Sequence, residues 1–121
     1  MFGIKNVVEA NVAVNQAREK LAQIAEAGML AELGNAVNAV AYAEGVAEAH
    51  YIKERLEGNG KSEPIIALEL AGRMSHGADD SWSGRGNDVQ RAKHDGFREA
   101  AQRIVQKARY QMEREAEALD V

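Results

Sequence analysis

Apolar side chains recur every three or four residues through most of the chain, which is the spacing of an α-helix that buries one face. In residues 4–27 two heptad positions are consistently apolar: Val7, Val14 and Leu21 fill one, and Ala10, Ala17 and Ile24 fill the other. Alanine at the second position allows another helix to approach closely. The pattern predicts a first helix from about Ile4 to Ala27, with Gly28 as its C-terminal cap.

A second helix is predicted over residues 29–57, and the Gly58-Asn59-Gly60 turn ends it. Its apolar stripe consists of Leu30, Leu33, Val37, Val40 and Ala47. Gly34 and Gly45 lie inside this helix, where a glycine costs about 1 kcal/mol relative to alanine. Such glycines mark either the close approach of another backbone or a bend, and the sequence leaves both open.

Ser62 and Pro64 have the residue types that begin a helix, as cap and first-turn residue. The apolar face of this third helix is predicted to contain Ile65, Leu68, Ala71 and Met74. Residues 75–88 are rich in glycine and serine and lack apolar periodicity, so they predict a long polar loop. The last helix is predicted over residues 89–118, with a stripe of Phe97, Ala101, Ile104, Ala108 and Met112.

No segment alternates apolar and polar residues as a strand does. The expected fold is therefore all-α, a helical bundle of about four helices with one long polar loop. The 121 residues are expected to form a single domain, residues 1–121. Aromatic residues are only 5% of the chain and alanine supplies much of the apolar content, so a lone chain buries little area per residue. We therefore expect a homo-oligomer.

The amino-acid composition excludes several kinds of site and of protein. The chain has no cysteine, which excludes disulfides and thiolate zinc sites. Its apolar runs are too short to span a bilayer, and its N-terminus lacks the features of a signal peptide. We expect a cytoplasmic protein with no membrane partner.

The net charge is −4, but the charges are unevenly distributed. Residues 1–84 carry seven basic and twelve acidic side chains, whereas residues 85–109 carry seven basic and only three acidic ones. Residues 113–121 form an acidic C-terminal tip. A basic stretch of this kind is typical of a surface that contacts phosphates.

The loop and the helix after it are therefore the candidate nucleic-acid site. Trp82 is the only tryptophan and can stack on an exposed base, which is worth about 1–3 kcal/mol per base. Arg85 can pair with a phosphate, and the basic residues of the last helix can follow the phosphate backbone. The predicted nucleic-acid-binding residues are Trp82, Arg85, Arg91, Lys93, Arg98 and Arg103.

The tryptophan and the basic residues each have an alternative interpretation. Trp82 can instead fold back into the core, and basic residues near glutamates often form only a solvated face. Several residues have the side chains of metal ligands: His76, Asp79, Asp80, His94 and Asp95. They match no complete metal-site spacing, and no nucleophile motif surrounds them. We therefore predict a non-enzymatic protein with no catalytic residues, metal ions or cofactors.

The segment HGADDSWSGRGND, residues 76–88, and the basic helix after it resemble small phage-encoded accessory proteins. Among these the chain looks most like the single-stranded-DNA-binding RNA polymerase cofactors of lytic podoviruses. The resemblance implies a viral transcription cofactor that acts in the host cell cytoplasm, with RNA polymerase as a further partner.

The leading prediction is a protein that binds single-stranded DNA, with RNA left open as a ligand. The alternative is a phage-type protein-interaction module that inhibits a host enzyme or defence complex through an acidic face. In that reading Glu44, Glu48 and Glu54 on the second helix are spaced like phosphates. The first reading requires the basic helix and the second requires the acidic face.

Overall fold

The computed structural model describes the backbone of residues 4–81 and 88–119 and the side chains of residues 4–74 and 88–118. Four helices make up nearly all of this part: α1 (Val7–Glu26), α2 (Leu30–Gly58), α3 (Glu63–Ser81) and α4 (Asp88–Leu119). The all-α prediction and the number of helices are confirmed.

The predicted loop over residues 75–88 is wrong at its start, because α3 continues to Ser81. Glycine and serine in this stretch each lower helix propensity by about 1 kcal/mol or less. A helix that has already nucleated extends through such residues, since each added residue contributes a further hydrogen bond. At the other end Asp88 is already the first residue of α4.

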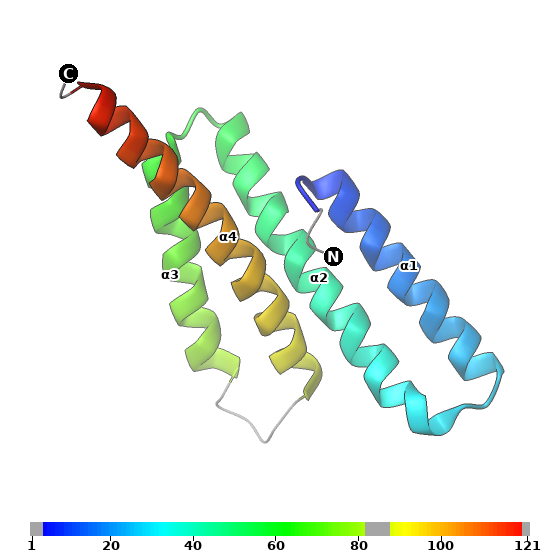
Figure 1. Cartoon of the computed structure of the whole chain (residues 1–121). Helices are drawn as coiled ribbons and strands as arrows, with labels where there is room; N and C mark the ends of the chain where they lie inside the picture. The colour runs from blue at the N-terminus through cyan, green and yellow to red at the C-terminus, as the bar shows by residue number, and fades with distance from the viewer. Residues whose placement is uncertain (1–3, 82–87, 120–121) are drawn as a thin grey trace.

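The helices lie side by side in the order α3, α4, α2, α1 (Figure 1). Helices α2 and α4 pack against each other in the middle, with α1 on the far side of α2 and α3 on the far side of α4. The two central helices run in the same direction and the two outer helices run opposite to them. None of the helices in the described residues is long and apolar enough to cross a membrane.

Local hydrogen bonds explain where α1 begins. The Asn6 side chain accepts from the Glu9 N–H at 2.9 Å, and the Glu9 carboxylate accepts from the Lys5 N–H at 3.0 Å. This reciprocal pair resembles a capping box. Glu54 of α2 accepts from the Val7 N–H at 2.5 Å and so ties the start of α1 to its neighbour. The helix therefore starts at Val7, three residues after the predicted start.

Glycine determines where α1 and α2 end. Gly28 and Gly60 have φ of +70° and +78°, the left-handed region that favours glycine. After α1, the Gly28 N–H donates to the Ala25 carbonyl and the Met29 N–H donates to the Ile24 carbonyl. These two bonds form a Schellman motif, and the same pattern follows α2 around Gly60. The predicted cap at Gly28 is confirmed.

The core is small and rich in alanine. The predicted faces of α1 and α4 are confirmed, since Ala10, Val14, Ile24, Phe97, Ala101 and Ala108 are all buried. The predicted face of α3 is only partly correct: Met74 packs against the core, but Ile65 and Leu68 are 50% and 74% exposed, and Ile66 and Leu70 are buried instead. Ile66, Leu70 and Met74 recur every four residues and lie in the core cluster or against it, so the buried stripe of α3 is rotated from the one that periodicity suggested. In α2 the predicted stripe starts at Leu30, which is 77% exposed.

The two central helices approach each other most closely at a pair of glycines. A Cβ added to Gly45 of α2 would overlap the Lys93 carbonyl oxygen and lie 2.7 Å from the Phe97 backbone nitrogen. A Cβ added to Gly96 of α4 would overlap the Tyr42 carbonyl oxygen. Close backbone packing, and not a bend, therefore explains the glycine at position 45. It does not apply to Gly34, where a Cβ would meet nothing within 4 Å.

Candidate nucleic-acid interface

Three exposed arginines form a line on the outer face of α4. Arg91, Arg98 and Arg109 are separated by seven and eleven residues, which are close to two and three full helical turns. All three are exposed, and at 1.5 Å per residue they span about 27 Å of the helix axis. We call them the arginine line. Arg109 was not among the predicted site residues, although the turn-by-turn spacing in the sequence contains the signal.

Charged neighbours affect the three arginines differently. Nε of Arg109 lies 3.2 Å from Glu113, in an exposed pair one turn apart. Arg91 also has an interaction partner. Among the described residues, no carboxylate lies within ion-pair distance of Arg98. Exposed pairs contribute at most about 1 kcal/mol, so a phosphate can compete with them.

Lys93 and Arg103, two other predicted site residues, do not lie on this line. The Lys93 ammonium is 3.8 Å from Glu48 of α2, and Arg103 is 3.8 Å from Glu99 on its own helix. Arg103 also lines a pocket between the helices. The structure therefore brings Arg91 and Arg98 together on one face and turns Lys93 and Arg103 away from it.

Trp82 and Arg85 lie outside the described residues. Their predicted contacts with bases and phosphates stay predictions. The described end of α3 at Ser81 and the start of α4 at Asp88 place them between these two helices in the chain.

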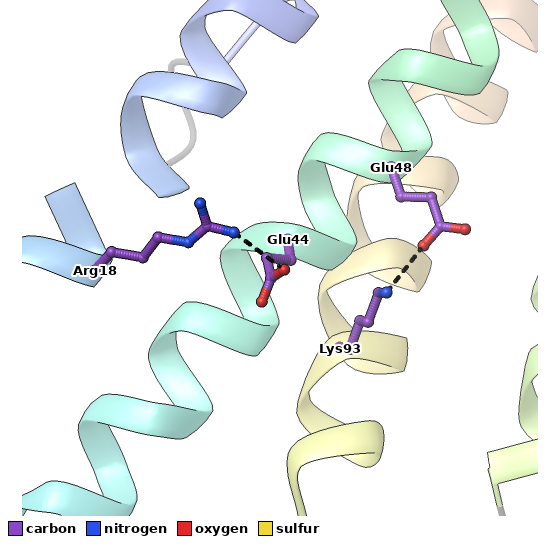
Figure 2. A network of polar contacts seen from close by, with 4 residues as sticks. All are labelled: Arg18, Glu44, Glu48 and Lys93. Carbon is purple, nitrogen blue, oxygen red and sulfur yellow. Dashed lines mark hydrogen bonds and ion pairs between the residues drawn. The ribbon is translucent and has the colours of Figure 1, made fainter. Parts of the chain in front are cut away.

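The acidic residues of α2 take part in contacts within the fold (Figure 2). Glu44 pairs with Arg18 of α1 at 3.5 Å, and Glu48 pairs with Lys93 of α4 at 3.8 Å. These two glutamates occupy successive turns and connect α2 to both of its neighbours. Glu54, the third residue of the predicted acidic face, accepts the hydrogen bond from the start of α1.

Where their side chains are described, the candidate metal ligands do not come together to form a site. His94 and Asp95 lie in α4, and His94 is half-buried with no hydrogen-bond partner for Nε2. In residues 4–74 and 88–118 no group of three His, Cys, Asp or Glu side chains is placed to hold a metal ion. The side chains of His76, Asp79 and Asp80 lie outside the described part.

A pocket of about 500 Å³ lies between α2, α3 and α4, and no pattern in the sequence indicates it. Tyr42 and His50 of α2 both line it. The Tyr42 hydroxyl donates a hydrogen bond to Glu99 of α4. Burial, together with this hydrogen bond to a carboxylate, raises the pKa of Tyr42 to about 12. The hydroxyl therefore stays protonated at neutral pH and links the two central helices.

His50 is the one buried polar residue among the described side chains, at 7% exposure. Burial lowers its pKa below the ordinary value of 6.5, and the nearby Lys53 ammonium lowers it further. Its Nδ1 has no hydrogen-bond partner in the described structure. A neutral imidazole therefore forms part of the pocket wall.

Comparison of the chain with protein-family models, with curated proteins and with solved structures finds no match.

Proposed function

We propose that this chain binds single-stranded nucleic acid along the outer face of α4, without catalysing a reaction. The observation that supports the proposal is the arginine line, because Arg91, Arg98 and Arg109 are exposed and aligned on one helix. Arginine suits this role, since its planar guanidinium donates two hydrogen bonds to a phosphate and stacks on bases. The contacts would be mainly with the phosphate backbone, so the affinity would depend weakly on sequence.

In this proposal Trp82 and Arg85 extend the surface beyond the first residue of α4. Trp82 would stack on a base, which favours an unpaired strand over a duplex, where the bases are already stacked. Arg91 and Arg98 would hold the adjoining phosphates. Lys93 and Arg103 lie off the arginine line, so we assign them a smaller part.

A role as a viral transcription cofactor, contact with RNA polymerase and assembly into a homo-oligomer belong to the same proposal. Several copies on one strand would place many weak basic sites together and raise the overall affinity without new contacts. The exposed apolar residues on the two outer helices, such as Val8 at 69% and Leu68 at 74%, favour assembly.

The alternative function, inhibition of a host protein through an acidic face, has weaker support. Mimicry of nucleic acid requires carboxylates that are available to a partner. Glu44, Glu48 and Glu54 each have a partner within the fold, and all three hold α2 to a neighbouring segment. A docking protein would have to compete with these contacts, of which the two exposed ion pairs contribute at most about 1 kcal/mol each.

The test is fluorescence anisotropy of a labelled oligothymidine and of a matched duplex, titrated with the chain over a range of salt concentrations. We expect tighter binding to the single strand and a log–log salt slope of about −2 to −3, the value for three phosphate contacts at about −0.7 each, or four with Arg85. Absence of binding at low salt, or an affinity that does not change with salt, would contradict the proposal.

A further inference from the structure

We propose that the pocket between α2, α3 and α4 binds a small amphipathic anion: a molecule with an apolar ring system or short hydrocarbon body and one acidic group. This site is separate from the arginine line, and none of Arg91, Arg98 and Arg109 lines it. Its volume of about 500 Å³ is within the range of small-molecule sites, about 300–1,000 Å³.

The wall of the pocket is suited to an apolar body. Helices α2, α3 and α4 all contribute aliphatic side chains to it: Val46, Ile66, Ala100, Ile104 and Ala108. Of these, Val46, Ile66 and Ala100 belong to the buried core cluster, so this part of the wall is held in place by packing. An apolar ligand placed there would cover apolar surface that otherwise faces the pocket, which favours binding.

The carboxylates around the pocket are already engaged. Glu57 pairs with Lys53 at 3.8 Å, and Glu99 accepts from Tyr42 and pairs with Arg103. Glu63 of α3 faces the Gln111 amide, whose nitrogen, when turned toward it, donates to both carboxylate oxygens at 2.9 and 3.0 Å. Two of the three negative charges in the lining are therefore paired with cations, and the third, on Glu63, is hydrogen-bonded to a neutral amide.

Two cations in the lining are not balanced in this way. Lys107 of α4 and Lys5, which precedes α1, both line the pocket, and neither ammonium has an ion-pair partner in the described residues. His50 adds no negative charge, because its side chain carries either no charge or a positive one. The lining therefore carries four basic and three acidic side chains, and this positive excess favours a ligand with a negative group.

The probe is 8-anilinonaphthalene-1-sulfonate, an amphipathic anion whose fluorescence rises in an apolar site. We expect saturable binding of one molecule per chain to the protein in its native fold, as monitored by circular dichroism. Decanoate should displace the probe, whereas decan-1-ol at the same concentration should not. Equal displacement by both would show that the site does not select for charge and would overturn the proposal.

Two variants test whether the probe binds in this pocket. Lys107→Glu reverses one unbalanced charge and should weaken binding about tenfold, the effect of about 1.4 kcal/mol. Ala67→Phe places a ring in the pocket, which Ala67 lines, and should reduce the affinity by at least as much. The matched control is Lys20→Glu, the same charge change at an exposed position of α1 outside the pocket.

Unchanged binding in Lys107→Glu, or an equal loss in Lys20→Glu, would contradict the assignment. Because Lys107→Glu changes only an exposed residue, it tests the pocket even if Ala67→Phe fails to fold. Ala67→Phe leaves the outer face of α4 intact, so its affinity for oligothymidine should not change. Failure of the pocket proposal and failure of the nucleic-acid proposal are thus separate results.

Discussion

Helix α2 faces α4 and α3 in opposite ways. Against α4 the backbones approach so closely that neither Gly45 nor Gly96 has room for a methyl group. Toward α3 the helices separate and enclose a pocket of about 500 Å³. At the α2–α4 contact, glycines without side chains allow the two backbones to meet. On the α3 side, polar and charged side chains surround the apolar wall of the pocket. The difference shows how one helix can be fixed tightly in the fold on one side and still leave space for a ligand on another.

The strongest test of this comparison is Gly96→Ala, which adds one methyl group where the Tyr42 backbone lies. The contacting atoms are backbone atoms, so the helices must separate for the methyl to fit. We expect the free energy of unfolding to fall by about 2 kcal/mol or more, since overpacking costs outweigh the better helix propensity of alanine. Urea denaturation followed by circular dichroism measures the change.

The control is Gly34→Ala in α2, where the new Cβ meets nothing within 4 Å. It should stabilise the protein by about 0.5–1 kcal/mol, because alanine is the better helix former. Similar effects of the two substitutions would mean that the glycine crossing does not determine the packing of α2 on α4.

A smaller loss is expected for Tyr42→Phe, which removes the hydroxyl that donates to Glu99 across the two central helices. The free energy of unfolding should fall by roughly 1 kcal/mol, the usual contribution of a partly exposed hydrogen bond. The pKa of Tyr42 is raised to about 12 in the folded chain. The folded state therefore holds this proton more tightly than the unfolded state does, so stability is fully present below pH 10 and falls as pH rises toward 12.

Between pH 10 and pH 12 the Tyr42→Phe variant should lose less stability than the unmodified chain. Absorbance of ionised tyrosine supplies an independent check, because one of the three tyrosines should ionise near pH 12. Loss of stability that is equally steep in both proteins would mean that Tyr42 is not the group responsible.

Acid should weaken the fold through His50. Its pKa is lowered by burial, so the unfolded chain binds the proton more readily than the folded chain. The contribution of His50 to stability is then complete above pH 6.5 and is lost as pH falls through the lowered pKa. We expect His50→Gln to flatten the decline of unfolding free energy between pH 7 and pH 5, measured by urea denaturation at each pH. An unchanged slope would show that His50 is not protonated on unfolding.

The smallest effect is expected for Ala67→Leu, which adds three carbon atoms on the pocket side of α3. The pocket has space for them, so the free energy of unfolding should change by less than about 1 kcal/mol in either direction. This contrasts with the one added carbon of Gly96→Ala. If Ala67→Leu were the more damaging of the two, the pocket would not be open as described.

The sequence predicted the elements better than their contacts. Heptad periodicity identified the buried face of α1, and Gly28 identified its end, because both depend on residues close in the chain. The register of α3 could not be read in this way, since Ile65, Ile66, Leu68 and Leu70 supply apolar residues on more than one face. Only the position of α4 determines that Ile66 and Leu70 are the buried pair.

The candidate site shows the same limit. The excess of basic residues over 85–109 indicated α4, but a count of charges does not show which way each side chain points. Lys93 turns toward Glu48, and Arg109 joins Arg91 and Arg98, for reasons of helix geometry that a count leaves out. The pocket was missed altogether, because Tyr42, Glu63 and Lys107 come from three helices whose arrangement depends on the packing of the whole chain.

In our proposal the outer face of α4 binds single-stranded nucleic acid. This binding is tested most directly by the affinity of Arg98→Glu for labelled oligothymidine, measured beside Arg55→Glu, the same change at an exposed arginine near the end of α2. We predict that Arg98→Glu weakens binding about tenfold or more and lowers the salt slope by about 0.7, while Arg55→Glu has little effect. Equal affinities for the two variants would contradict the account, because net charge alone would then explain the binding.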